Sequence, residues 1–299
     1  MDDIYLAIDI GGTFLKYGLI NRNGELIEDN QMVTSPNWDG LMASVSEVIN
    51  DVGENLLGIG ISCPGTVDVE KGIVYDGGLL PYLDKVNLKS YIEDSYEVPC
   101  WVTNDGKAAI MAEIWQGNLK DVLNGAAIVL GSGVAGAIVL NGSLLEGSNY
   151  KAGEFSFISN LKGEKFAEHN MVGFDASAVK FIRTCAEVLN FKDLHDGPSV
   201  FEVIATGENK HINGLFDEYC MVISHLIMNL QAILDLEKIV IGGGISKQSQ
   251  LIHNVIFQYQ KLRNEIPIYK EKFPEIEIDV CKYYNSSNLL GAVYPFFKY

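Results

Sequence analysis

The sequence is short of positive charge. Only 22 Lys and Arg residues stand against 39 Asp and Glu, so the formal net charge of the 299-residue chain is −17. A surface this acidic repels the phosphates of nucleic acids and anionic lipids, which argues against a general nucleic-acid-binding or membrane-surface protein. A small phosphorylated ligand remains compatible, because a local nest of backbone N–H groups can outweigh the global charge.

Cysteine is also scarce, and no CxxC pair occurs among Cys63, Cys100, Cys185, Cys220 and Cys281. The odd count and the scattered positions favour buried thiols in a reducing compartment over a disulfide framework or a zinc knuckle. The start of the chain, Met1-Asp2-Asp3, is acidic where a signal peptide needs cationic residues. We therefore expect a cytoplasmic protein.

Long hydrophobic runs are few, and one stretch needs a membrane test. Residues 122–145 carry no charge and are long enough to cross a bilayer. Glycines and the turn at Asn141-Gly142 interrupt the run, so it predicts two strands around a turn instead. At 47% hydrophobic and 20% charged residues, the chain has enough apolar material for about two domains with their own cores.

Several signatures of catalytic folds are absent. The only Gly-Lys pair, Gly106-Lys107, precedes Ala108, so there is no Walker A motif, and no GxGxxG follows the first strand. The five histidines show no HxxxH or HExxH spacing, and Ser62 lies outside any GxSxG elbow. These absences argue against P-loop NTPases, Rossmann dehydrogenases, zincins and esterases. We expect His225, in an apolar helical stretch, to be a core histidine with its polar atoms satisfied.

What is present is an internal repeat. Strands at 4–10 and 15–20 flank the turn Gly11-Gly12-Thr13, and an Asn-Gly turn leads to a third strand at 25–27. About 120 residues later, strands at 128–130 and 137–140 flank Gly131-Ser132-Gly133, and Asn141-Gly142 leads to residues 144–145. The repeat predicts two related domains, each opening with a hairpin meander.

Helical and strand-like segments alternate through the rest of the chain. We predict helices at 38–52, 88–96, 107–115, 177–189, 215–234 and from Ser246 onward, and strands at 57–62, 100–103 and 237–241. Such a mixture indicates layers of α/β structure.

Three glycine-rich turns could hold phosphates. The turns at Gly11, Gly131 and Gly242-Gly243-Gly244 each follow an apolar strand, and glycine lets backbone N–H groups converge on an anion. Asn104-Asp105, between a strand and a helix, fits equally well as a helix N-cap or as a catalytic base at a strand end. Glu154, taken alone, is more typical of a solvated charge.

Together these segments resemble the ROK family of sugar kinases and transcriptional repressors, in the actin-like ATPase superfamily. The matches run in order along the chain: Asp9-Ile10-Gly11-Gly12-Thr13 as a first phosphate motif, Cys63-Pro64-Gly65, Leu80-Pro81, Asn104 to Ala109 as "NDANAA", Leu130 to Gly136 as a second phosphate motif, Ala152-Gly153-Glu154 as "AGE", Ile241 to Ser246 as an adenosine motif, and Ser287 to Ala292 as "GLIGAA".

The resemblance implies an α/β, two-domain actin-like ATPase (ribonuclease H-like) fold with a cleft between the domains. An N-terminal domain, 1–118, would be completed by a C-terminal helix at 286–299, and 119–285 would form the second domain. Because Asp9 lies almost at the start, we expect no DNA-binding extension, which favours a kinase over a repressor.

The resemblance also implies roles for individual residues. Asp105 is the expected catalytic base and Asp9 the expected water-mediated Mg²⁺ ligand. The expected ATP and phosphate contacts are Asp9, Gly11, Gly12, Thr13, Lys16, Gly131, Ser132, Gly133, Gly243 and Gly244. The expected sugar contacts are Gly65, Asn104, Asp105, Glu154, Phe157 and Asp175, with Glu168 as the second choice for the last.

Three departures from the family pattern matter. Leu79 stands where the family usually has Asn before Leu-Pro, and Phe157 replaces the His of "AGEIGH". No CxCGxxGCxE follows, so we expect no zinc site. The overall expectation is a homodimeric, ATP- and Mg²⁺-dependent kinase for the 6-hydroxyl of glucose, a β-glucoside such as cellobiose, N-acetylmannosamine or fructose. The alternative is a catalytically silent sugar or nucleotide sensor.

Overall fold

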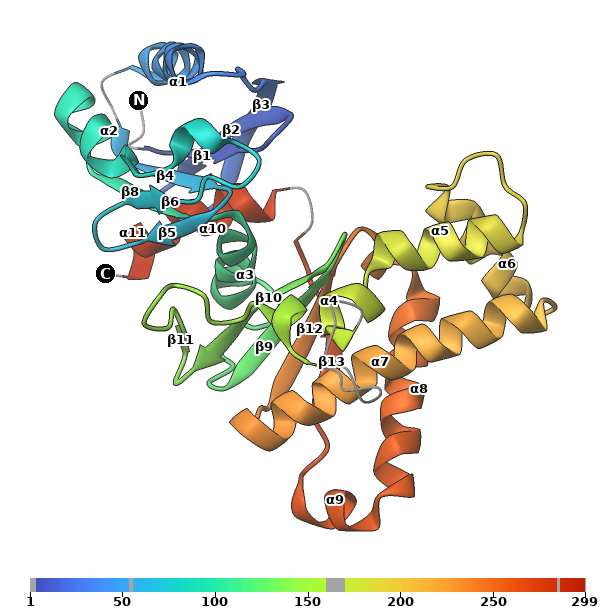
Figure 1. Cartoon of the computed structure of the whole chain (residues 1–299). Coiled ribbons are helices and arrows are strands. Elements are labelled where there is room, and N and C mark those ends of the chain that lie inside the picture. The colour runs from blue at the N-terminus through green and yellow to red at the C-terminus, as the bar shows by residue number, and fades with distance from the viewer. Residues whose placement is uncertain (1–3, 54–55, 160–169, 284–285, 299) are drawn as a thin grey trace. The chain divides into compact units, whose positions relative to one another are not determined.

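The structure is a computed structural model that describes residues 4–53, 56–159, 170–283 and 286–298. The chain divides into two compact units (Figure 1). Unit 1 comprises 1–117, 146–151 and 283–299, and unit 2 comprises 118–145 and 152–282. Each unit has a five-stranded sheet and its own hydrophobic core.

The sheet of unit 1 has the strand order β3-β2-β1-β4-β8. The first three strands, β1 (Ile4–Ile10), β2 (Phe14–Asn21) and β3 (Leu26–Val33), form the predicted antiparallel meander. β4 (Leu56–Cys63) and β8 (Cys100–Asn104) run parallel to β1. Parallel strands end at the same edge of a sheet, so the carboxyl ends of β1, β4 and β8 lie together.

The helices of unit 1 are α1 (Trp38–Val52), α2 (Leu88–Tyr96), α3 (Asp105–Gln116), α10 (Ser287–Val293) and α11 (Pro295–Lys298). Helix α1 begins where the Asn37 side chain accepts a hydrogen bond from the Gly40 N–H, and it buries a stripe that includes Leu41, Val45 and Val48. A small antiparallel sheet, β5 (Thr66–Asp68), β6 (Ile73–Tyr75) and β7 (Val86–Asn87), and a 3₁₀ turn η1 (Pro81–Leu83) lie between β4 and α2 in the sequence.

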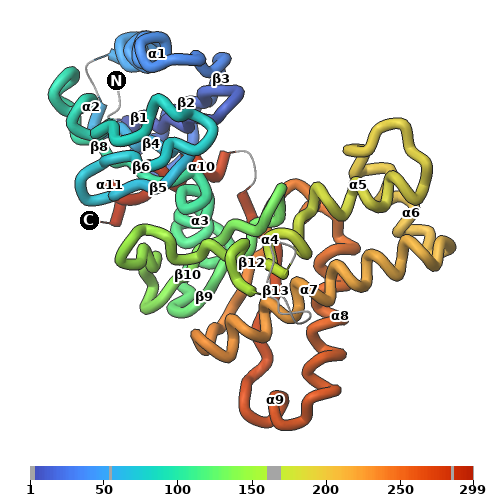
Figure 2. The backbone as a smooth tube through the Cα atoms, in the orientation of Figure 1, coloured from blue at the N-terminus to red at the C-terminus, as the bar shows by residue number. Residues whose placement is uncertain are grey.

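The C-terminal helix α10 returns to the N-terminal strands. It contacts β1, β4 and α3, and Figure 2 shows this red segment beside the blue strands of the same unit. Two glycines permit the close approach: a Cβ on Gly60 would lie 2.3 Å from the Ala292 carbonyl oxygen, and one on Gly291 would lie 1.7 Å from that of Ala108. Since such distances are impossible for a real side chain, only glycine fits at these two positions.

The sheet of unit 2 has the order β11-β10-β9-β12-β13. Its strands are β9 (Gly125–Leu130), β10 (Val134–Leu140), β11 (Ser143–Leu144), β12 (Lys238–Gly243) and β13 (Glu277–Val280). The first three form an antiparallel meander and the last two run parallel to β9. The two sheets therefore have the same order and strand directions, which confirms the repeat predicted from the glycine turns.

The helices of unit 2 are α4 (Val172–Asp175), α5 (Ala178–Val188), α6 (Gly197–Thr206), α7 (Lys210–Leu234), α8 (Ser249–Glu265) and α9 (Pro267–Lys272), with 3₁₀ turns η2 (Phe155–Phe157) and η4 (Gly244–Lys247). The uncharged run 122–145 forms β9 and β10 around a turn, as predicted, and the short strand β11 follows them. Among the described residues, no helix is long and apolar enough to cross a membrane.

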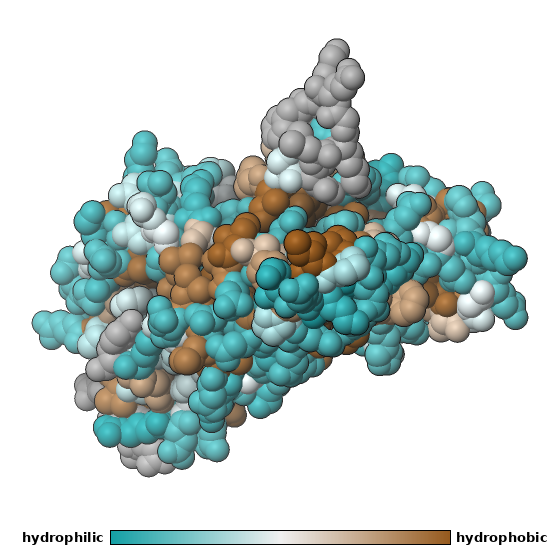
Figure 3. All heavy atoms as spheres, turned by 90° about the horizontal axis from the view of Figure 1, so that it is seen from below, coloured by the Kyte–Doolittle hydropathy of each residue, from teal (hydrophilic) through white to brown (hydrophobic). Residues whose placement is uncertain are grey.

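One side-chain prediction is wrong. His225 does not lie in the core: its side chain is exposed on α7, whereas the neighbouring Leu226 and Ile227 are buried. Helix α7 also begins at Lys210, five residues before the predicted start, where Asn209 caps it by accepting from the N–H groups of His211 and Ile212. On the face seen in Figure 3, hydrophilic side chains surround a band of hydrophobic ones.

Candidate active site

The carboxyl-end edge of the unit 1 sheet gathers several predicted site residues. In the strand register, Asp9 lies opposite Ser62, Ser62 opposite Thr103, and Cys63 opposite Asn104. The edge therefore presents a row of polar side chains, one from each parallel strand. Chemistry in open α/β sheets is placed at such an edge.

Asp105 is the first residue of α3, and Asn104 is its N-cap. The Asn104 Oδ1 accepts from the Lys107 N–H at 3.2 Å, while its Nδ2 donates to the Gly65 carbonyl at 2.9 Å and to Asp105 Oδ1 at 3.0 Å. The Gly106 N–H donates to the same Asp105 oxygen at 2.7 Å. The cap is thus Asn104 and not Asp105, so the helix start leaves the Asp105 carboxylate available for another role.

Burial raises the pKa of Asp105 above its ordinary value, and the nearby Asp9 carboxylate adds to the rise. The hydrogen bonds from Gly106 and Asn104 act in the opposite direction, because they stabilise the charged form. A carboxylate whose pKa is raised in this way is a better proton acceptor than an ordinary surface aspartate.

Cys63 lies close to the carboxylates of Asp105 and Asp9. Its side chain is fully buried, and burial, then the charges of Asp105 and Asp9, raise the pKa of the thiol far above its ordinary value. A thiol this hard to ionise is unreactive, so Cys63 has a packing role at this edge.

Asp9 is 6% exposed and is held by two side chains that the sequence analysis did not single out. Ser62 Oγ donates to Asp9 Oδ1 at 2.6 Å, and Asn288 Nδ2 donates to the same oxygen at 3.0 Å. The position of Ser62 two residues before Pro64-Gly65 was a usable signal. The contribution of Asn288 was not visible, because 279 residues separate it from Asp9.

The first phosphate turn is shaped by backbone contacts. The Gly11 N–H donates to the Phe14 carbonyl at 3.0 Å, and Thr34 Oγ1 donates to the Gly11 carbonyl at 2.7 Å. Gly12 and Thr13 are exposed at the tip, and Lys16 lies opposite Asp9 in the β1–β2 pair. The turn thus places small residues and one cation next to the Asp9 carboxylate.

A buried lysine follows Asp105 on α3. The Lys107 ammonium pairs with the Glu146 carboxylate and donates to the Tyr150 carbonyl at 3.0 Å, and the Tyr150 hydroxyl donates to Asp68 at 2.9 Å. These bonds fasten the 146–151 segment to the helix that carries Asp105. The segment directly precedes Ala152-Gly153-Glu154 in the chain.

In unit 2, the second phosphate turn and the adenosine turn are neighbours. Leu130 and Gly243 pair in the β9–β12 register, so Gly131-Ser132-Gly133 and Gly244 follow adjacent strand ends. A Cβ on Gly243 would lie 2.1 Å from the Leu130 carbonyl oxygen, and its φ of +98° favours glycine. The Ala178 N–H at the start of α5 donates to the Gly131 carbonyl at 2.9 Å.

Glu154 directly precedes the short 3₁₀ turn η2, and Phe157 is its last residue. Glu154 is exposed, and Phe157 is 71% exposed, which is unusual for so large an apolar side chain. Ser156 between them accepts from the Val134 N–H at 2.8 Å, so η2 is held against the strand that follows the second phosphate turn. The geometry thus fixes the backbone under Phe157 and leaves its ring accessible.

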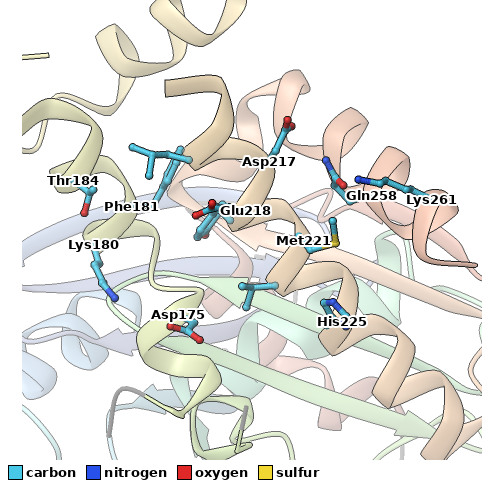
Figure 4. Close-up of a pocket in the computed structure, with 13 residues that line it drawn as sticks. Asp175, Lys180, Phe181, Thr184, Asp217, Glu218, Met221, His225, Gln258 and Lys261 are labelled. Atoms are coloured by element: carbon cyan, nitrogen blue, oxygen red, sulfur yellow. The ribbon is translucent and has the colours of Figure 1, made fainter. Parts of the chain in front are cut away.

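Asp175 ends α4, a helix that packs against η2. It lines a cavity of about 540 Å³ between α5, α7 and α8, together with Lys180, Glu218 and His225, and Figure 4 shows these side chains around the opening. Neither Glu154 nor Phe157 lines that cavity. The second candidate for the same role, Glu168, lies outside the described residues.

The donor set at Asp9 fits a magnesium ion and no tighter metal site. No group of three or more His, Cys, Asp or Glu side chains that could hold a metal occurs in the described part of the chain. Magnesium keeps most of its waters and is typically held by one or two carboxylates plus nucleotide phosphates. A single carboxylate beside a phosphate turn satisfies that requirement.

Known proteins resemble this chain over nearly its whole length. The ROK family model matches residues 5–162 and 188–297. A β-glucoside kinase of Listeria monocytogenes is 27% identical over 98% of this chain and 97% of its own length. An N-acetylmannosamine kinase of Haemophilus influenzae is also 27% identical, over 97% of this chain and 94% of its own.

A solved structure shares the fold. A ROK family protein from Streptococcus pneumoniae, in complex with sucrose, has a TM-score of 0.88 at 25% identity and covers 99% of this chain and 98% of its own. The predicted actin-like α/β fold is confirmed, and the predicted enzyme class, an ATP-dependent carbohydrate kinase, agrees with the names of the relatives. With two repeated sheets, three glycine turns and a family match over most of its length, the chain belongs to the ROK family.

Proposed function

We propose that the protein transfers the terminal phosphate of ATP to the 6-hydroxyl of a hexose or hexoside, with β-glucosides such as cellobiose among its substrates. The observation that carries the proposal is Asp105: a largely buried carboxylate with a raised pKa, at the end of β8, freed from the capping role by Asn104.

Asp105 accepts the proton of the sugar 6-hydroxyl as the oxygen attacks the γ-phosphorus. The bond from that phosphorus to the bridging oxygen breaks, and ADP leaves with the electron pair. Hydrogen bonds from Asn104 and Gly106 hold the Asp105 carboxylate in one orientation, so it meets the hydroxyl without first rearranging.

The remaining assignments follow the same scheme. Gly11, Gly12, Thr13 and Lys16 would contact the nucleotide phosphates, and the residues of the turns at Gly131 and Gly243 would contact the nucleotide as well. Asp9 would hold Mg²⁺ through water. When bound, the ion neutralises charge on the phosphates. Gly65, Asn104, Glu154, Phe157 and Asp175 contact the sugar.

Phe157 supports the preference for a β-glucoside. Its exposed ring replaces a histidine of the family motif, so the site loses a hydrogen-bond donor and gains an apolar surface. The C–H face of a second sugar ring or of an aryl aglycone packs well on an aromatic ring. Free glucose lacks that second ring, whereas cellobiose provides it.

A coupled ADP-release assay over glucose, cellobiose, N-acetylmannosamine and fructose tests the proposal. We expect turnover with glucose and cellobiose. In Phe157→Ala, kcat/KM for cellobiose should fall about fivefold relative to glucose, equivalent to roughly 1 kcal/mol for about 40 Å² of apolar contact. Phe157→His restores the family residue and is the matched control, which should favour glucose.

Two outcomes would contradict parts of the proposal. A strong preference for glucose in both wild type and Phe157→Ala would refute the aromatic role. ATP binding without turnover on any sugar would favour a sensor, although a sensor has no need of a base at Asp105.

We further propose that the protein is a homodimer in the cytoplasm. Light scattering after size-exclusion chromatography would test the oligomeric state.

A further inference from the structure

Both hydrogen bonds described for the Asp9 side chain end on one oxygen. Ser62 Oγ, on β4, lies 2.6 Å from Asp9 Oδ1, and Asn288 Nδ2, on α10, lies 3.0 Å from the same atom. Two donors on one oxygen fix the plane of the carboxylate. Of these two donors, neither reaches Oδ2, which is therefore the oxygen left for a ligand.

The two donors, Ser62 and Asn288, lie far apart in the sequence. Ser62 is fully buried and belongs to the strand that pairs with β1, so its hydroxyl is delivered by the sheet register. Asn288 is half-buried, and only the close approach of α10 brings it within reach. That approach depends on Gly60, against Ala292, and on Gly291, against Ala108.

The chemistry of the amide suits this place. The Asn288 Nδ2 donates a hydrogen bond to the carboxylate and adds no negative charge near a phosphate turn.

We propose that Asn288 is a positioning residue that orients the Asp9 carboxylate so that Oδ2 faces the hydrated Mg²⁺ of bound nucleotide. The proposal rests on the proposed function only for the identity of the nucleotide. Partners that orient a metal-binding carboxylate commonly change metal affinity by roughly 10- to 100-fold when they are removed. Asn288 acts through Asp9 and has no contact of its own with the reacting atoms.

The test is calorimetric binding of ADP in the presence of Mg²⁺ and, separately, of EDTA, for wild type and Asn288→Ala. We expect the gain in ADP affinity that Mg²⁺ gives to wild type to shrink about tenfold in the variant. ADP affinity in EDTA and KM for the sugar should stay the same. Ser286→Ala, in the same turn but without a bond to Asp9, is the matched control and should match wild type.

Ser62→Ala provides a second variant that removes only one buried hydroxyl. It should reduce the Mg²⁺-dependent gain in the same direction, and an unchanged gain in a folded Ser62→Ala would overturn the idea that the orientation of Asp9 controls Mg²⁺ affinity. An unchanged Mg²⁺-dependent gain in a folded Asn288→Ala would overturn the proposal. Because the binding readout needs no sugar, a wild-type protein that binds Mg²⁺ and ADP but phosphorylates nothing would refute the kinase assignment alone.

Discussion

At the residue scale, the site depends on the separate roles of two neighbouring residues: Asn104 caps α3, and Asp105 is left to act on a ligand. Either residue type could cap α3, but the backbone places Asn104 at the cap and Asp105 one position later. The neutral amide therefore satisfies the helix N–H group, and the Asp105 carboxyl group occupies a partly buried place beside Asp9, where its pKa is raised. Burying a charge without a counter-charge destabilises the fold, so this arrangement costs stability for the sake of reactivity.

Asp105→Asn should separate these two effects. We expect kcat to fall by about 10²–10⁴-fold, because the amide cannot accept the hydroxyl proton. The amide oxygen can still accept the bonds from Asn104 and Gly106, so sugar binding, measured by calorimetry, should remain. A variant that turns over at nearly the wild-type rate would show that Asp105 is not the base.

The same substitution should raise the thermal midpoint at pH 7. The folded-state pKa of Asp105 lies above its ordinary value of 3.8. Wild type therefore loses stability as pH rises through that pKa and the buried carboxyl ionises, whereas the variant does not. The difference in Tm should close as pH falls toward 4, which scanning calorimetry across that range would show. A lower Tm for the variant at pH 7 would contradict the buried-charge argument.

At the scale of elements, the packing of α10 depends on glycines that the sequence does not mark as special. Gly291→Ala would place a methyl group 1.7 Å from the Ala108 carbonyl oxygen, on the helix that begins with Asp105. We expect a loss of about 1–3 kcal/mol in the free energy of unfolding, typical of overpacking. Denaturant titration measures this loss.

Gly214→Ala is the matched control for that substitution. Gly214 lies within α7, and a Cβ there meets nothing within 4 Å. Alanine should therefore stabilise the helix by about 0.5–1 kcal/mol. Equal effects of the two substitutions would mean that α10 packs less closely against α3 than the structure has it.

The helices and strands themselves were largely predictable from the sequence, whereas the contacts between elements far apart in the sequence were not. The two meanders are local: glycine turns at Gly11 and Gly131 join their first two strands, and Asn-Gly turns join the second strand to the third. Helix starts shifted where capping decided them, as at Asn209, which precedes the predicted apolar periodicity. The bond between Asp9 and Asn288 depends on tertiary packing of the two chain ends, so no local pattern could indicate it.

At the scale of the whole molecule, cysteine usage bears on whether a metal supports the fold. All five cysteines are free and buried, with Cys63 and Cys100 in unit 1 and Cys185, Cys220 and Cys281 in unit 2. They serve the hydrophobic cores as small apolar side chains. The family's cysteine triplet, which follows the "AGE" motif in a single loop, has no counterpart in this sequence.

The purified protein should accordingly hold no stoichiometric zinc. Zinc ligands must converge on one point as thiolates or imidazoles, and Phe157 offers neither where the family has histidine. Elemental analysis should find far less than one zinc per chain, and EDTA should leave the thermal midpoint unchanged, because structural zinc contributes directly to folding free energy. About one zinc per chain, or a clear fall in Tm with EDTA, would overturn this expectation. The ligands would then have to include His169, which lies outside the described residues. Cysteine thiols that are buried in the structure would have to leave the cores and bind the zinc together with it.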